Sequence, residues 1–232
     1  MLSLPMTVFA EDASELPDGI NESYKEYLKL VGEGIVGEDV TYEYWCSIIE
    51  RSIQLEDMLE QSSKFECVAV FQGNANTLAD STYIMCARDV FITNGTSSKG
   101  LYGHAGIVIS SSEILHIAGP NKTPKTVTLC DWTGRYNADG WTKVYRHSSS
   151  STAVAAAKWA ERTYKGSSAE YEITLNLAST DVTYCSKIVW QAYYYGPASH
   201  CANGSTTGVC LPYDLPTRVQ NLTLHQTFNK LQ

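Results

Sequence analysis

The chain has 232 residues, of which 44% are hydrophobic and 18% charged, and its formal net charge at pH 7 is −8. This composition excludes disordered and fibrous proteins, and the length allows one sizeable core, or one domain with an appendage. Acidic residues are concentrated before residue 61, and basic residues are scattered without a visible patch. We therefore do not expect nucleic acid as a partner, because phosphate binding depends on clustered Lys and Arg.

The first ten residues form an apolar run that ends in Val8-x-Ala10, with small residues where a signal peptidase cleaves. We interpret this run as the tail of a secretory signal; the alternative is an apolar arm packed on the domain. The run is too short to span a bilayer, and no other stretch of the sequence approaches that length. We expect a secreted protein, extracellular or associated with the cell wall, without a transmembrane segment.

The N-terminal region is predicted to be mainly helical. Apolar residues at helical spacing predict helices at Tyr24–Val31 and Tyr42–Leu59, separated by a turn at Gly32–Gly37, and the run Phe65–Phe71 predicts a strand. We expect a remnant of the signal at residues 1–10, a leader and helical region at 11–80 and a catalytic domain at 81–232. The alternative is one continuous domain over residues 11–232.

From residue 88 onward, short apolar stretches are separated by Gly, Asn and Pro turn signals. The predicted strands are Val90–Thr93, His104–Ser110, Ile114–Ala118, Thr126–Trp132 and Trp141–His147. Helices are predicted at Ser151–Tyr164 and Cys185–Tyr195, and Gly196-Pro197 closes the second. Helices, then antiparallel strands, then helices predict an α+β fold.

Cys185 stands at the start of an amphipathic helix. Helix-terminal N–H groups and a neighbouring imidazolium favour the thiolate, and lower the thiol pKa from about 8.5 into the range of roughly 3.5 to 7.5. The alternative is a buried small hydrophobic residue, the usual state of a free cysteine. The polar run before the helix favours a sulfur that projects toward a cleft, so we assign Cys185 as a nucleophile.

His104 opens a strand, and Gly103 and Gly106 beside it leave room around the ring for a helix or a substrate. An imidazole that titrates near neutral pH suits a general base. The alternative is a structural histidine. We assign His104 as the base that partners Cys185.

Three stretches then occur in the order of a known family: Arg88–Phe91, Gly103–Ile109 and Tyr184–Tyr193. They match a Gly-Asp-Ile-Val-like strand, a Gly-His-Val-Gly-Ile strand and a Tyr-Cys-Ser-x-Leu-Val-Trp helix. Over roughly residues 81–196 the chain resembles the circularly permuted, YiiX-like branch of the papain-like NlpC superfamily, in which histidine precedes cysteine. The resemblance implies a permuted papain-like fold, with an antiparallel sheet packed against the nucleophile helix and extra N-terminal helices.

His116 lies in a stretch that resembles the Ile-His-Ala strand carrying the third polar residue of NlpC-type enzymes. If the two histidine strands form a hairpin with a three-residue loop at Ser110–Ser112, His104 faces Ala118 and His116 faces Gly106. The two rings then share one sheet face as diagonal neighbours, whereas a two-residue loop would put them on opposite faces. We assign His116 as the residue that orients His104.

Tyr184 stands where non-permuted cell-wall endopeptidases commonly carry an aspartate that can read a substrate amine. We assign Tyr184 to substrate binding, and its identity puts specificity for free-amine stem peptides in doubt. We expect no cofactor.

Together with the assigned residues, the resemblance implies a secreted thiol hydrolase, a cysteine peptidase or amidase that cleaves an amide bond through an acyl-enzyme on Cys185. The expected partner is a peptide or amide substrate, namely the stem peptide of bacterial peptidoglycan. One alternative is a lipid-directed esterase or acyltransferase on the same scaffold. The other is a non-catalytic binding module held together by disulfides.

The chain has seven cysteines, and six remain when Cys185 is set aside. In an oxidising compartment six cysteines permit three disulfides, and the single pairing we favour is Cys201 with Cys210. No Cys-x-x-Cys pair or tight Cys/His cluster occurs, so we expect no metal. Four further polar residues are expected at the surface: His147, Gln191, His200 and His225.

Overall fold

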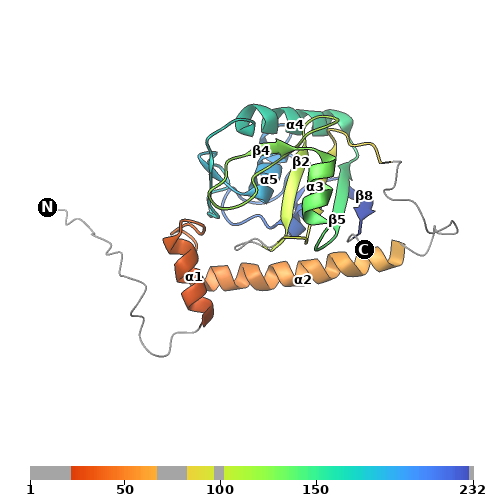
Figure 1. Cartoon of the computed structure of the whole chain (residues 1–232). Helices are drawn as coiled ribbons and strands as arrows, with labels where there is room; N and C mark the ends of the chain where they lie inside the picture. The colour runs from red at the N-terminus through yellow and green to blue at the C-terminus, as the bar shows by residue number, and fades with distance from the viewer. Residues whose placement is uncertain (1–21, 67–82, 97–101, 230–232) are drawn as a thin grey trace.

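A six-stranded antiparallel sheet organises the fold in the computed structural model, which describes residues 22–66, 83–96 and 102–229 (Figure 1). The strand order is β4-β3-β2-β1-β5-β8. The strands are β1 (Asp89–Thr93), β2 (His104–Val108), β3 (Ile114–His116), β4 (Lys125–Val127), β5 (Thr142–His147) and β8 (Leu222–Phe228). With the helices described below, the fold is α+β, as predicted.

The two faces of the sheet carry separate hydrophobic clusters, because successive side chains of a strand point to opposite faces. Val90, Ile92, Ala105 and Ile107 belong to the larger cluster, which includes the buried residues of α5 (Cys185–Tyr195). We call this side of the sheet the α5 face. Phe91, Val108, Ile114 and Val144 pack on the opposite side against α3 (Leu129–Tyr136), and we call that side the α3 face.

Helix α5 begins and ends at the predicted residues, and α4 (Ser150–Tyr164) matches the predicted helix to within one residue. The Ser149 side chain caps α4 by accepting the Thr152 N–H at 3.3 Å. Small residues, Ala153, Ala156 and Ala160, are buried in the cluster that α4 and α5 share. Helix α5 is therefore fixed on both sides, by α4 and by the sheet.

A short parallel pair, β6 (Glu170–Tyr171) with β7 (Val182–Thr183), leads directly into α5. Gln191, expected at the surface, is fully buried, and its amide donates to the carbonyls of Leu177 and Ser179 at 2.7 and 2.9 Å. Its amide oxygen accepts the hydroxyl of Tyr164. Gln191 thus anchors the loop that precedes β7 and α5, which explains why a polar side chain lies in the core.

Helix α3 replaces part of a predicted strand. The stretch Thr126–Trp132 was expected to be extended, but β4 ends at Val127 and the helix begins at Leu129. Thr128 accepts the Asp131 N–H, and the Asp131 carboxylate accepts the Thr128 N–H, so a capping box starts the helix. The strand prediction is therefore wrong over Leu129–Trp132, and α3 lies against the sheet (Figure 1).

The N-terminal helices are α1 (Glu22–Gly32) and α2 (Tyr42–Glu66), and α2 runs beyond its predicted end. Phe65 and Glu66 are helical, so the strand predicted at Phe65–Phe71 is wrong for these two residues, and residues 67–71 lie outside the described ranges, as do residues 1–21. Figure 1 shows α2 as the long helix below the sheet. Leu30, Trp45 and Leu55 join the cluster of α5.

The C-terminal segment contributes η1 (Pro212–Asp214), α6 (Leu215–Arg218) and the edge strand β8, which pairs with β5 and was not predicted. His147, expected at the surface, is 1% exposed because its ring stacks on Tyr193 and its Nδ1 accepts the Ser149 N–H at 3.0 Å. His200 and His225 are exposed, as expected. No helix within the described ranges is both long and apolar enough to cross a membrane.

Candidate active site

The first residue of α5 is Cys185, whose side chain is 2% exposed. Burial raises the pKa of the Cys185 thiol to about 11, because a thiolate would lose its hydration. Hydrogen bonds from the Ala105 backbone N–H and from Ser186 act in the opposite direction but do not outweigh burial. The lowered thiol pKa expected from the helix N-terminus is therefore wrong for this structure, in which Cys185 is a neutral thiol.

The two histidines meet as the hairpin predicts. In the β2–β3 register Ile107 pairs with Leu115 and Val108 with Ile114, and the Ile109 N–H donates to the Glu113 carbonyl at 3.0 Å across the serine loop. His104 Nε2 and His116 Nδ1 lie 2.8 Å apart, and the rings are 4% and 0% exposed. The three-residue loop therefore brings both rings to the α3 face in hydrogen-bonding contact.

The environment disfavours the charged form of both imidazoles. Burial, the neighbouring ring and the charge of Arg135 hold the pKa of His104 well below its usual range. Burial and the charges of Lys125 and Arg135 lower the pKa of His116 to about 3. A neutral pair leaves one proton between the facing nitrogens, so one ring donates and the other accepts.

The tautomer that suits a base carries its proton on His104 Nε2, which then donates to His116 Nδ1. This leaves His104 Nδ1 unprotonated, and none of the described residues hydrogen-bonds to it. The His116 proton then lies on Nε2, which is buried without a partner. His104 Nδ1 is therefore free to accept a proton from a thiol.

Cys185 and His104 approach the same end of β2 from different faces. The sulfur lies against the backbone N–H of Ala105, the residue that follows His104, while the His104 ring packs toward α3. Among the described residues no hydrogen bond joins the sulfur to either ring. The structure thus places the candidate nucleophile and the candidate base beside one strand end, with no hydrogen bond between them.

We expect the buried His116 to make the fold sensitive to acid. Its pKa falls from 6.5 to about 3 on folding, so between these values the unfolded chain binds a proton that the folded chain does not. The unfolding free energy should then fall by up to about 1.4 kcal/mol for each pH unit below about 6.5 from this group alone.

His116→Asn removes the titrating group and keeps an acceptor for His104. Urea unfolding of wild type and variant over the acidic range measures the effect: the destabilisation caused by the substitution should shrink as the pH falls. Curves that stay parallel across the whole range would contradict a buried neutral imidazole at this position.

Aromatic side chains of α3 surround the histidines and were not assigned to the site from sequence. Trp132 stacks on His104 with ring centroids 5.4 Å apart, and Tyr136 lies 5.0 Å from His104. The Tyr136 side chain is 4% exposed and its hydroxyl oxygen has no hydrogen-bond partner. The capping-box pattern was the one sequence signal that could have placed this helix here.

Gly103 allows the Tyr213 ring to pack closely against the backbone just before β2. Its φ is +78°, a left-handed conformation, and a Cβ at this position would lie 2.5 Å from the Tyr213 ring. The glycine before the histidine is therefore required by a close contact with η1, in addition to the room that it leaves beside the imidazole.

Tyr184, assigned to substrate binding, has a fully buried side chain. Its hydroxyl accepts the Cys210 N–H at 3.0 Å and so supports the loop before η1. The substrate contact proposed for this side chain does not agree with its burial, and the structural role explains the residue better.

The disulfide expected between Cys201 and Cys210 is absent, and all six cysteines within the described ranges are free. The Cys201 N–H bonds to the Tyr193 carbonyl, whereas the Cys210 carbonyl accepts the Ser186 hydroxyl. Tyr193 and Ser186 stand near opposite ends of α5, about 10 Å apart along the axis, and a disulfide allows at most about 7 Å between Cα atoms. Cys67 lies outside the described residues.

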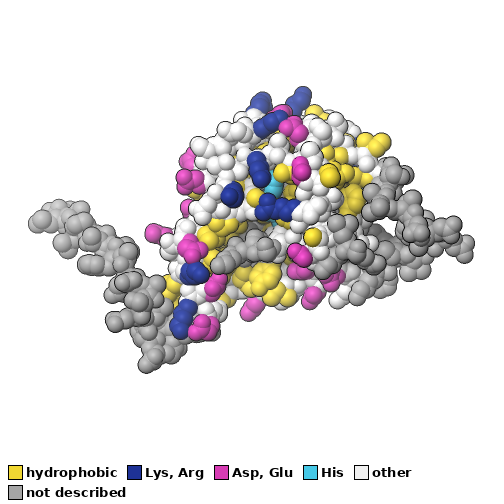
Figure 2. All heavy atoms as spheres, in the orientation of Figure 1, with side chains coloured by type: hydrophobic (Ala, Val, Ile, Leu, Met, Phe, Trp, Pro, Cys, Tyr) yellow, Lys and Arg dark blue, Asp and Glu magenta, His cyan; other side chains and the backbone are white. Residues whose placement is uncertain are grey.

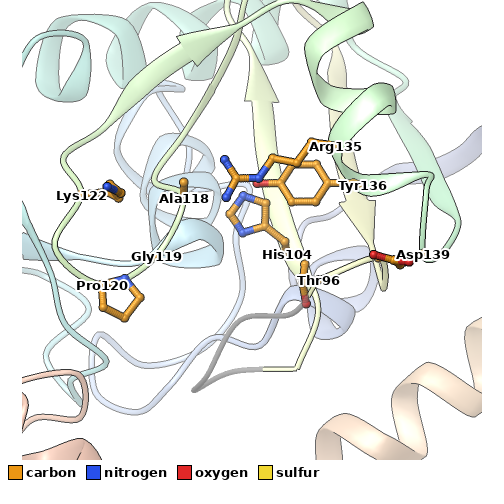
Figure 3. Close-up of a pocket in the computed structure, with 10 residues that line it drawn as sticks. Thr96, His104, Ala118, Gly119, Pro120, Lys122, Arg135, Tyr136 and Asp139 are labelled. Atoms are coloured by element: carbon orange, nitrogen blue, oxygen red, sulfur yellow. The ribbon is translucent and has the colours of Figure 1, made fainter.

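A pocket of about 270 Å³ opens at the His104 ring. Its walls are Gly95 and Thr96, the loop from Ala118 to Lys122, the end of α3 with Arg135 and Tyr136, and Asp139 in the turn that follows (Figure 3). In Figure 3 the Arg135 guanidinium lies close to His104 and Tyr136, and Lys122 stands on the far side of Ala118. Within the described ranges, no three His, Cys, Asp or Glu side chains gather in a way that could hold a metal ion.

A sequence model of the family described as "Lipoprotein N-acylation protein LnsA-like" matches residues 53–222, which include Cys185, His104 and His116. The chain belongs to this family. An LnsA-like assignment supports an enzyme that acts on acyl groups and gives no support to a cell-wall peptidase. It also agrees better with the lipid-directed alternative than with cleavage of stem peptide.

One curated relative of this LnsA-like chain is an uncharacterised 30.3 kDa protein of Bacillus thuringiensis, which is 34% identical over an alignment of 142 residues; the match covers 57% of this chain. The matched part is 53% of that relative, so the chain spans about half of its length. A solved structure, described as metalloprotein YiiX from Escherichia coli O157:H7, covers 64% of this chain and 99% of its own, with 16% identity and a TM-score of 0.42.

Proposed function

We propose that this protein is a cysteine acyltransferase that takes a fatty acyl group from a lipid ester as a thioester on Cys185 and passes it to an amine. The observation that carries the proposal is the His104–His116 pair, held at 2.8 Å beside the strand end that contacts the thiol, in a chain of an N-acylation family. The scaffold in this proposal is the permuted papain-like arrangement, with the histidine strand before the cysteine helix. The family description supplies the acceptor class, the amine of a lipoprotein.

The first half-reaction forms the acyl-enzyme. The Cys185 sulfur attacks the ester carbonyl while His104 Nδ1 takes the thiol proton. The bond from carbonyl carbon to ester oxygen breaks, and His104 returns the proton to the departing alkoxide. His116 accepts the Nε2 hydrogen bond throughout and so keeps the ring in the tautomer that leaves Nδ1 free.

The second half-reaction transfers the acyl group. The acceptor amine attacks the thioester carbonyl, His104 takes a proton from the nitrogen, and the carbon–sulfur bond breaks as the sulfur recovers that proton. Water would compete in the same step and yield a free fatty acid. The burial of Cys185 and the aromatic rings around His104 limit the access of water, which favours transfer over hydrolysis.

The negative charge that develops on the carbonyl oxygen during the attack must be stabilised by hydrogen-bond donors. One is the Cys185 backbone N–H at the free N-terminus of α5, where the Tyr184 side chain makes no cap. In this proposal the other is the hydroxyl of Tyr136, a residue of the pocket wall whose buried hydroxyl oxygen has no partner at rest. A donor without a partner in the free enzyme can bind the oxyanion without first breaking a bond.

Tyr136→Phe tests that donor. We expect the acylation rate to fall about 100-fold, as for loss of one oxyanion donor, while the unfolding midpoint stays constant or rises, because the lost hydroxyl makes no hydrogen bond. Tyr164→Phe is the matched control: its hydroxyl bonds Gln191, so this variant should lose stability and keep its rate. A wild-type rate in Tyr136→Phe would remove the tyrosine from the mechanism.

The proposed function itself is tested by intact-mass spectrometry of the protein incubated with phosphatidylglycerol in neutral detergent micelles. We expect a mass increase of one acyl group, located on Cys185 by peptide mapping, and its loss when a synthetic diacylglyceryl-cysteine peptide is added. The acyl group should appear as an amide on that peptide. Release of fatty acid only, with the peptide unchanged, would make the enzyme a hydrolase instead.

A further inference from the structure

Basic side chains gather at the pocket beside His104, although the chain as a whole carries a net charge of −8. Lys122 and Arg135 line the pocket, and Lys125 lies near enough to influence His116. Figure 2 shows dark-blue basic side chains around the cyan histidine on this face of the molecule. The pocket therefore lies in a local positive field.

Lys122 and Arg135 form no ion pair with a described carboxylate, whereas Lys125 lies near enough to Asp131 to help lower the pKa of that carboxyl. All three cations are exposed. Asp139 is the one carboxylate among the lining residues, and it lies beyond ion-pair distance of Lys122 and Arg135. Arg135 instead lies over the Tyr136 ring, with its guanidinium carbon 5.4 Å from the ring centroid.

The positive charges at the pocket disfavour the protonation of His104 that the proposed reaction requires. A bound anion would offset this effect. Arg135 disfavours a positive charge on His104, and Lys125 and Arg135 disfavour one on His116. Yet His104 must become positively charged when it takes the thiol proton. An anion held between Arg135 and Lys122 would neutralise the opposing field and support the imidazolium as the thiol is deprotonated.

We propose that this pocket binds the phosphate of a phospholipid acyl donor, with Arg135 and Lys122 as its ligands. This assignment deepens the proposed function and rests on it. A guanidinium binds two phosphate oxygens at once, and a lysine adds a point charge. A polar pocket of about 270 Å³ fits a headgroup. A phosphate held there places the nearby acyl ester at the mouth of the site, beside His104.

The experiment compares two donors in the same neutral detergent micelles: phosphatidylglycerol and uncharged diacylglycerol with the same acyl chains. The measured quantity is the rate of Cys185 acylation, by intact mass, for each donor. We expect wild type to prefer phosphatidylglycerol at least tenfold, and Lys122→Gln/Arg135→Gln to lose most of that preference. Lys158→Gln/Arg162→Gln removes two exposed cations of α4 and is the control for net charge; it should keep the preference.

Added glycerol 3-phosphate and inorganic phosphate distinguish a lipid headgroup from a free phosphate. Weak competition with phosphatidylglycerol, and a preference that decreases with salt, support the assignment. An equal ratio of the two rates in wild type and Lys122→Gln/Arg135→Gln overturns it, while the acyl-enzyme itself still upholds the proposed function. Tight binding of free phosphate without any preference between the donors also overturns it. If neither donor acylates Cys185, the proposed function and this inference both fail.

Discussion

Cys185→Ala is expected to abolish acyl-enzyme formation and to lower turnover by at least about 10⁴-fold, as in other enzymes that lose a nucleophile. The proposed intermediate is a thioester on the Cys185 sulfur, so no other group of the site can replace the thiol. The side chain is small and already buried, so the thermal midpoint should change by only a few degrees. Intact mass after incubation with lipid ester, together with a melting curve, gives both readouts.

Cys201→Ala is the matched control for Cys185→Ala, because Cys201 is also a free cysteine but contacts the C-terminal end of α5. It should retain acylation at the wild-type rate. An acyl adduct that persists in Cys185→Ala would assign the nucleophile to another residue.

His104→Ala should lower the acylation rate by about 10³-fold or more, because it removes the base that takes the thiol proton. The thiol of Cys185, with its pKa raised to about 11 by burial, then has no acceptor near neutral pH. The rate that remains should rise steeply with pH as hydroxide replaces the base. A pH profile of single-turnover acylation measures this change.

His116→Ala should cost less than His104→Ala, since it removes only the acceptor that fixes the tautomer of His104. His116→Asn should recover part of the loss. If His116→Ala proves as damaging as His104→Ala, the two rings act as one proton-transferring unit, and the assignment of His116 as an orienting residue is wrong.

The histidine pair could be predicted from sequence because local rules determine it. Strand side chains alternate with a period of two, and a serine run of three residues sets the hairpin register, so the shared face of His104 and His116 follows from counting. Helix α5 was equally well defined, by its apolar spacing and by Gly196-Pro197 at its end.

The surroundings of the pair could not be predicted in the same way. Leu129 and Trp132 fit an apolar strand pattern as well as the buried side of a helix, and only the capping pattern at Thr128 and Asp131 distinguishes the two. The raised pKa of the thiol depends on burial by distant segments, which no helix-terminus rule contains. Tyr184 illustrates the same limit, because its partner Cys210 lies on a later loop.

The cluster of cations at the pocket could not be predicted from the sequence because it depends on the topology of the fold. Lys122 lies in the loop after β3 and Arg135 in the last turn of α3, and the sequence between them contains β4 and the helix start. The cations look scattered along the chain because only the return of α3 across the sheet brings them to one pocket.

The burial of Cys185 changes how chemical labelling of the cysteines of this protein should be interpreted. A reactive cysteine is commonly recognised as the one that alkylating or oxidising reagents modify first, since these reagents attack exposed thiolates. Here Cys130 is exposed and Cys185 is protonated in the interior, so the first cysteine to be labelled should be a bystander. Slow labelling of Cys185 would then report how often the site opens, and the same enclosure would protect the nucleophile from peroxide between catalytic cycles.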